Sequence, residues 1–356
     1  MLPSLAGSAS SNDVEAMTMN SSGVWVFEYV SGGGLGRVLA GANGAALLEA
    51  GRAMRDALVQ DLSSLPDVAL RWAGGAGDGA PRDDESIADF VRREAARQRW
   101  CWVVAPESEG VLAALASAVA PRAWIGCTQA AIVLCASKRA TLARLAACGL
   151  ATPLAFERPP ACGDASGPPR GTRKSASGLA FPCEPEATRW IVKPDDGAGT
   201  VDTRRHDTRD RADADLAARR ARGASATLEH WVDGEALSLA LLCGPHGAEL
   251  LAINRQRIAI DAEGRLHDEG VAIRQMALDD PRAAPLAELA RAVHGAIDGL
   301  RGFVGIDVVW HATHGPVAIE VNPRLTSAYV GLSAALGRNL AAEILALHEE
   351  VNDVAA

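Results

Sequence analysis

Near its C-terminus the chain reads Gly302-Phe303-Val304-Gly305-Ile306-Asp307 and, shortly after, Ile319-Glu320-Val321-Asn322-Pro323-Arg324. Residues two apart on a strand point to the same side, so Glu320 and Asn322 would share one face. A hairpin turning near residues 313–316 would bring Asp307 beside them. Two carboxylates and an amide oxygen suit a Mg²⁺ that nucleotide phosphates also hold. The alternative is two ordinary strands with acids near a turn. It does not explain why an acid stands in a half-buried apolar run, where an unpaired carboxylate is energetically unfavourable.

Lysine is rare in this chain. Lys and Arg total 35, yet the lysines are only Lys138, Lys174 and Lys193, as expected of a chain encoded by a GC-rich genome. Lys193 ends an apolar strand that runs into a loop with Gly197 and Gly199, and Lys138 opens a helical stretch. Lysine there acts as a point charge against phosphate oxygens, and glycines let backbone N–H groups approach them. We predict that Lys138 and Lys193 bind phosphate, the alternative being surface lysines, and assign no task to Lys174.

The first part of the chain predicts an open α/β domain over residues 23–128, after a disordered tail at 1–22. Strands are expected at 24–30, 67–72, 100–104 and 123–126, and helices from the glycine run to about residue 60, at 86–99 and at 109–119. The run Ser31-Gly32-Gly33-Gly34-Leu35-Gly36 fits neither a Walker A loop nor G-x-G-x-x-G. It therefore forms either a tight crossover turn or a place where substrate approaches the backbone at Ser31, Gly32 and Gly33.

The second part predicts antiparallel strands at 189–193, 225–232, 236–243, 248–260, 303–310 and 316–321, and exposed helices at 204–222 and 285–299. We expect a central subdomain at 129–232, interrupted by a Pro/Gly-rich excursion at 157–187, and a C-terminal subdomain at 233–350 that carries the magnesium site. In Asn254-Arg255-Gln256-Arg257 two arginines stand among apolar neighbours. Either Arg255 and Arg257 look into a cleft, where they would pair with a substrate carboxylate, or the strand is an exposed edge.

Bulk composition excludes several functional classes. A net charge of −9 without a basic stripe argues against nucleic-acid binding. No apolar run reaches the length of a membrane span, and the N-terminus lacks the pattern of a signal peptide. Seven cysteines without C-x-x-C spacing favour reduced thiols in a cytoplasmic protein, and the histidines lack metal-binding spacing. We therefore expect small-molecule substrates and leave open a monomer or a homodimer.

These pieces, in this order, resemble the ATP-grasp superfamily over roughly residues 130–345. The resemblance implies an α/β fold in which an open N-terminal α/β domain precedes two α+β subdomains that clasp ATP. It implies ATP and two Mg²⁺ ions as cofactors. It places Lys138 and Lys193 on the α- and β-phosphates, the metal on Asp307, Glu320 and Asn322, and Arg324 near the transferred phosphate.

The resemblance also implies a hinge that recognises adenine, with its counterpart in Leu228-Glu229-His230-Trp231-Val232-Asp233-Gly234-Glu235. Glu229 would accept from the adenine amino group, and the backbone from Trp231 to Val232 would pair with the ring. The ribose-binding acid of the family commonly falls two residues after the hinge glycine, where this chain has Ala236. Glu235, one residue earlier, is our candidate for that role.

Within the superfamily, Phe27-Glu28-Tyr29-Val30-Ser31-Gly32-Gly33-Gly34 and Glu320-Val321-Asn322-Pro323-Arg324-Leu325-Thr326-Ser327 are similar to the tyramine–glutamate ligase family of methanofuran biosynthesis. That family includes bacterial relatives that make the analogous cofactor of one-carbon metabolism. The similarity implies that a carboxylate is phosphorylated and the acyl phosphate is then attacked by an amine, which releases ADP and phosphate.

For this chain the resemblance predicts that the γ-carboxyl of L-glutamate is joined to tyrosine or tyramine, with Lys193, Arg324 and Arg255 as catalytic residues. An aromatic wall for the phenol would come from Trp25, Tyr29, Trp231 or Tyr329. The alternatives are a dipeptide or D-alanine–D-alanine-type ligase, a carboxylase or carbamoyl-phosphate-type subunit, and a nucleotide-binding regulatory protein without turnover.

Overall fold

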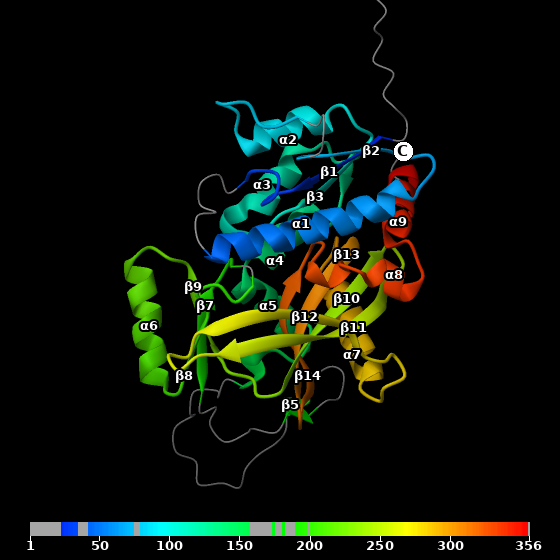
Figure 1. Ribbon diagram of the computed structural model, residues 1–356. Coiled ribbons are helices and arrows are strands. Elements are labelled where there is room, and N and C mark those ends of the chain that lie inside the picture. The colour runs from blue at the N-terminus through cyan, green and yellow to red at the C-terminus, as the bar shows by residue number, and fades with distance from the viewer. Residues whose placement is uncertain are drawn as a thin grey trace, which may run out of the picture.

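The computed structural model describes residues 23–34, 42–74, 79–156, 173–174, 180–181, 189–197 and 199–354 (Figure 1). The predicted tail at 1–22 and most of the predicted excursion at 157–187 lie outside the described residues. In Figure 1 the elements up to α3 form the upper part of the molecule, and the antiparallel strands β7 to β14 lie below them. Among the described helices, none is long and apolar enough to cross a membrane.

An open parallel sheet forms the N-terminal part, with strand order β2-β1-β3-β4. Its strand β1 (Gly23–Glu28) is buried along its whole length, because neighbouring strands and helices cover its apolar side chains. The other elements are α1 (Ala42–Ser63), β2 (Ala69–Trp72), α2 (Ile87–Ala95), β3 (Trp100–Val104), η2 (Ser108–Gly110), α3 (Val111–Ala118) and β4 (Trp124–Ile125). The predicted alternation of strands and helices around a parallel sheet is confirmed.

A smaller antiparallel sheet follows, with order β8-β7-β9. This region comprises α4 (Gln129–Ala136), α5 (Lys138–Ala147), η3 (Pro153–Phe156), β5 (Arg173–Lys174), β6 (Ala180–Phe181), β7 (Trp190–Pro194), β8 (Arg204–His206), α6 (Arg209–Ala221) and β9 (Ala226–His230). The prediction of one helix over 204–222 is wrong at its start, because Arg204–His206 pairs with β7. The helix begins only after Thr208, whose side chain accepts a hydrogen bond from the Arg211 N–H and caps the first turn.

The largest sheet is antiparallel, with order β12-β11-β10-β13-β14. Its strands are β10 (Glu235–Gly244), β11 (Gly247–Ile260), β12 (Leu266–Met276), β13 (Gly302–His311) and β14 (Gly315–Asn322), accompanied by α7 (Ala283–Ala296), η4 (Ser327–Tyr329), α8 (Leu332–Leu336) and α9 (Leu340–Val354). The hairpin predicted around Thr313–Pro316 is confirmed, since β13 and β14 pair directly. Strand β12 was not predicted, and its pairing with β11 places β11 inside the sheet rather than at an edge.

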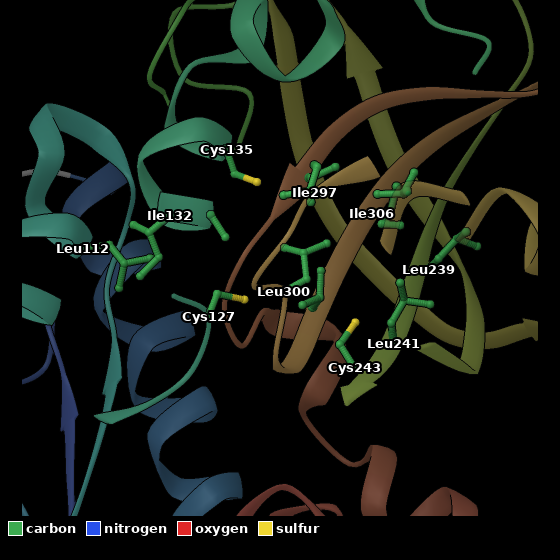
Figure 2. Packing of buried hydrophobic residues seen from close by; sticks show 14 of the residues in the cluster. Leu112, Cys127, Ile132, Cys135, Leu239, Leu241, Cys243, Ile297, Leu300 and Ile306 are labelled. Carbon is green, nitrogen blue, oxygen red and sulfur yellow. The ribbon is translucent and has the colours of Figure 1, made fainter. Parts of the chain in front are cut away.

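One hydrophobic core joins the N-terminal part to the large sheet. Leu239 and Leu241 of β10 pack with Ile297 and Leu300, and the same cluster extends to Ile132 of α4 (Figure 2). Leucine at alternate positions of β10 therefore defines an inner face. The opposite face packs Ala240, Leu242 and Phe303 into a second apolar cluster and carries the polar residues Ser238, Asn254 and Asp307 beside it.

Two aromatic residues proposed for a substrate wall belong to the core instead. Trp25 is buried against Phe27 and Phe90. Tyr329 is 1% exposed, and its hydroxyl donates to Asp61 Oδ2 of α1 at 2.5 Å. The predicted contact of Tyr329 with a phenol is therefore wrong, because its ring and its hydroxyl already have partners.

Candidate active site

Asp307 and Glu320 face each other across the β13–β14 pair. Gln256 Nε2 donates to Asp307 Oδ1 at 2.9 Å, and Asn322 Nδ2 donates to Asp307 Oδ2 at 3.4 Å. Burial, and then the neighbouring Glu320 carboxylate, raise the pKa of Asp307 to about 7. Two acids held so close with an amide beside them form a donor set that fits a divalent cation, which would relieve their repulsion. No cluster of three His, Cys, Asp or Glu occurs in the part of the chain that the structure describes, so phosphate oxygens would have to complete the coordination.

Lys138 links this acidic pair to the central subdomain. Its side chain, at the first turn of α5, is 4% exposed, and Nζ lies 2.8 Å from Glu320 Oε1. It also donates to the carbonyl oxygen of Gly197 in the glycine loop. The predicted phosphate-binding helix, glycine loop and metal-binding strand therefore meet at one ammonium group.

Lys193 and Glu229 form a second buried ion pair, on neighbouring strands β7 and β9. Nζ of Lys193 lies 2.9 Å from Glu229 Oε2, and the two side chains are 6% and 2% exposed. Burial raises the pKa of Glu229 against the opposing effect of Lys193. The other carboxylate oxygen, Oε1, has no hydrogen-bond partner among the described residues. A buried oxygen without a donor fits the predicted contact with an amino group of adenine.

Asp195 connects the strand that carries Lys193 to the helix that begins at Lys138, and no local sequence pattern indicated this contact. It follows β7, and its carboxylate accepts from Ser137 Oγ at 2.7 Å and from the Arg139 N–H at 2.9 Å. Its carbonyl oxygen accepts from the Lys138 N–H at 2.9 Å. An acid at a helix N-terminus is favourable because it meets unpaired N–H groups and the positive end of the helix dipole.

Arg324 pairs with an acid from the N-terminal part. Its Nε donates to Glu107 Oε1 at 2.9 Å, and its Nη1 donates to the Leu325 carbonyl at 3.3 Å. Burial lowers the pKa of Arg324, but Glu107 and the more distant Glu320 and Asp307 outweigh it, so the net pKa is raised and the guanidinium stays charged. Arg324 thus lies next to the acidic pair, where the resemblance predicts the transferred phosphate.

Arg255 and Glu235 do not face this site, contrary to prediction. Ser238 pairs with both Asp307 and Asn254, so these three residues share one face of the sheet. Arg255 directly follows Asn254 on β11 and therefore lies on the opposite face. There Arg255 Nη2 lies 2.5 Å from Glu235 Oε1, and Arg282, at the start of α7, lies 2.7 Å from Glu235 Oε2. The structure therefore brings neither Glu235 nor Arg255 to the acidic pair, where the ribose contact and the carboxylate clamp were predicted.

The side chains that reach the site from β11 are instead the amides. Gln256 contacts Asp307, and Asn254 is fully buried, with its Oδ1 accepting from the Arg274 N–H. Arg257 is exposed. The alternation of arginine and amide in the sequence was visible, but which of the two faced the metal pair was not.

The remaining predicted residues occupy turns. The Glu28 carboxylate accepts from the Val30 and Ser31 N–H groups, and a side chain at Gly32 would collide with Phe27 and the Glu28 carbonyl. Residues 28–34 therefore form a tight turn, with Gly33 at φ +95°.

In the predicted hinge, the Trp231 ring N–H donates to Asp233 and Val232 is buried. Gly199 has φ +65°, which favours glycine.

Comparison with known proteins places this geometry in a family. A model of the ATP-grasp domain matches residues 135–328, more than half of the chain, and a model of the pre ATP-grasp 3 domain matches residues 74–132. A search of the curated proteins gave no match.

Several solved structures share the fold. A putative ATP-grasp superfamily protein from Archaeoglobus fulgidus has a TM-score of 0.61 and 18% identity, with 92% of this chain and 88% of that chain covered. An L-amino acid ligase from Bacillus licheniformis has a TM-score of 0.58 and 16% identity, covering 91% and 73%. A D-alanine–D-alanine ligase from Bacillus anthracis has a TM-score of 0.57 and 13% identity, covering 94% and 100%.

Proposed function

The chain belongs to the ATP-grasp family, and on that premise we propose that it is an ATP- and Mg²⁺-dependent carboxylate–amine ligase. The observation that carries the proposal is the arrangement of two buried lysine–glutamate pairs, Lys138–Glu320 and Lys193–Glu229, around Asp307. Each pair joins a cation suited to phosphate with an acid suited to metal or adenine. A protein that only folded this way would have no need to bury four such charges together.

In the proposed reaction the residues of the chain bind and neutralise phosphate. Lys138 and Lys193 hold the α- and β-phosphates with the N–H groups of the glycine loop, and Glu229 receives the adenine amino group. Bound at Asp307, Glu320 and Asn322, Mg²⁺ would supply the positive charge that stabilises phosphoryl transfer. Arg324 neutralises the phosphoryl group as the substrate carboxylate attacks it. An amine then displaces phosphate from the acyl phosphate and forms an amide.

The substrate pair that we propose is L-glutamate with tyrosine or tyramine. Its support is the similarity of residues 27–34 and 320–327 to the tyramine–glutamate ligase family. Among solved structures of this fold, one is an L-amino acid ligase and another is a D-alanine–D-alanine ligase. Arg255 lies on the opposite face, whereas Arg324 lies beside the acidic pair and could meet an anionic substrate.

The test is ADP release from Mg-ATP over a panel of amino acids and amines, followed by mass spectrometry of the products. We expect condensed glutamyl-tyrosine or glutamyl-tyramine with ADP. Rapid ADP release with a different pair would leave the ligase class and remove the glutamate–tyramine assignment. Tight binding of a nonhydrolysable ATP analogue without ADP release on any pair would favour a nucleotide-binding regulatory protein.

A further inference from the structure

Glu107 is a buried carboxylate with one oxygen left over. It follows β3 in Ala105-Pro106-Glu107-Ser108-Glu109-Gly110 and is 5% exposed. Oε1 accepts from Arg324 Nε at 2.9 Å, whereas Oε2 is buried and has no hydrogen-bond partner in the described ranges of the chain. Buried acceptors in native proteins nearly always have a donor, so this oxygen needs one that the described part of the chain does not provide.

The loop that carries Glu107 touches both sides of the proposed phosphate site. Glu107 contacts Arg324, which we place beside the transferred phosphate. Two residues later, the main-chain N–H of Glu109 donates to Asp196 Oδ2 at 3.0 Å, and Asp196 precedes Gly197 of the glycine loop. A group bound to Glu107 Oε2 would therefore lie close to the acyl phosphate.

The charges around this oxygen favour a cation. Glu107, Glu320 and Asp307 all act on Arg324, and Lys138 pairs with Glu320, which gives three acids for two cations. In the proposed function Asp307 and Glu320 would hold Mg²⁺, whereas Glu107 Oε2 is an acceptor that Arg324 does not contact. A primary ammonium group brings three N–H donors and a positive charge to such a place, whereas a second carboxylate would be repelled.

Building on the proposed ligase function, we propose that Glu107 Oε2 binds the ammonium group of the amine substrate and takes one of its protons. The freed amine attacks the carbonyl carbon of the acyl phosphate. A C–N bond forms while the bond from that carbon to the phosphate oxygen breaks. The second proton lost by nitrogen leaves with the phosphate as hydrogen phosphate, and Glu107 returns its own proton to solvent, so one H⁺ is released for each amide.

The test separates binding of the ammonium group from formation of the acyl phosphate. In Glu107→Gln the amide oxygen still accepts from Arg324 Nε, so the arginine stays in place while the negative charge is lost. We expect the KM for the best amine of the panel to rise about tenfold to a hundredfold, as for a lost charge-assisted hydrogen bond. Hydroxylamine, which is uncharged at neutral pH, should still trap the acyl phosphate as a hydroxamate at the wild-type rate. Glu109→Gln is the matched control, because the exposed side chain of Glu109 lies on the same loop. It should change neither the KM for the amine nor the rate of hydroxamate formation.

If the wild-type enzyme is active, two results would overturn the proposed role of Glu107. An unchanged KM for the amine in Glu107→Gln would show that Oε2 meets only water. A parallel loss of hydroxamate formation would show that Glu107 serves only to position Arg324. A wild-type enzyme that forms neither amide nor hydroxamate with any pair would instead remove the ligase assignment, and this inference with it.

Discussion

Replacing Glu320 by glutamine should abolish turnover and leave the fold in place. Glu320 Oε1 lies 2.8 Å from Lys138 Nζ, with side chains 14% and 4% exposed. Glutamine keeps an oxygen at that point, and Lys138 still donates to the Gly197 carbonyl. What is lost is one negative charge, and with it a ligand for the metal.

The structure sets different magnitudes for stability and for rate. Breaking a buried ion pair outright costs about 3–5 kcal/mol. In Glu320→Ala, relief of the repulsion with Asp307 offsets part of this, so we expect about 2–3 kcal/mol less unfolding free energy. Glu320→Gln retains the acceptor and should lose only about 1 kcal/mol. For both variants, loss of a group that stabilises the developing charge should slow turnover by a factor of about a hundred or more.

Urea unfolding followed by tryptophan fluorescence measures the first quantity, and ADP release from Mg-ATP measures the second. Glu350→Gln, an exposed acid on α9 whose side chain is 45% exposed, is the control and should change neither. Turnover of Glu320→Gln within about threefold of the wild-type rate would refute the role of Glu320 as a metal ligand. Equal destabilisation by glutamine and by alanine would show that the preserved acceptor has no effect on stability.

Three further results are expected. Mg²⁺ affinity should fall by up to about tenfold per pH unit below about pH 7. The reason is that burial and Glu320 raise the pKa of Asp307 to about 7, so that protons compete with the metal below that pH. Titration calorimetry with a nonhydrolysable ATP analogue at several pH values measures this, and an affinity independent of pH would contradict it. ATP should be strongly preferred to GTP, because Glu229 Oε1 needs a donor where guanine presents a carbonyl; equal kcat/KM values would show that the hinge is misplaced. Arg255→Ala should keep turnover within a few-fold, because Arg255 pairs with Glu235 on the far face of the sheet, and a hundredfold loss would place that arginine back in the mechanism.

Several residues of the candidate site could be predicted from local sequence patterns. Glu320 and Asn322 alternate on one strand, and Lys138 and Lys193 are conspicuous among many arginines. The hairpin that brings Asp307 to them spans only a short turn, so its register follows from nearby residues. For these residues the structure brings together what the pattern indicated.

The residues that were missed depend on contacts far apart in the chain. Asp195 meets Ser137 over a separation of 58 positions, and Glu107 meets Arg324 over 217. Arg255 was misplaced for a related reason. Strand alternation shows that Arg255 and Gln256 point to opposite sides, but only the pairing of β11 and β13 with β10 decides which side holds Asp307.

The contacts of Asp195 have a consequence for how this chain tolerates change. Asp195 ties the end of β7 to the start of α5, through its hydrogen bonds to Ser137, Lys138 and Arg139. Because the ends are tied to each other, lengthening the chain between them adds only a slowly growing loop entropy and does not shift Lys138 relative to Lys193. The Pro/Gly-rich stretch at 157–187 is therefore where a peptide tag or a whole inserted domain could be accommodated while the KM for ATP stays unchanged.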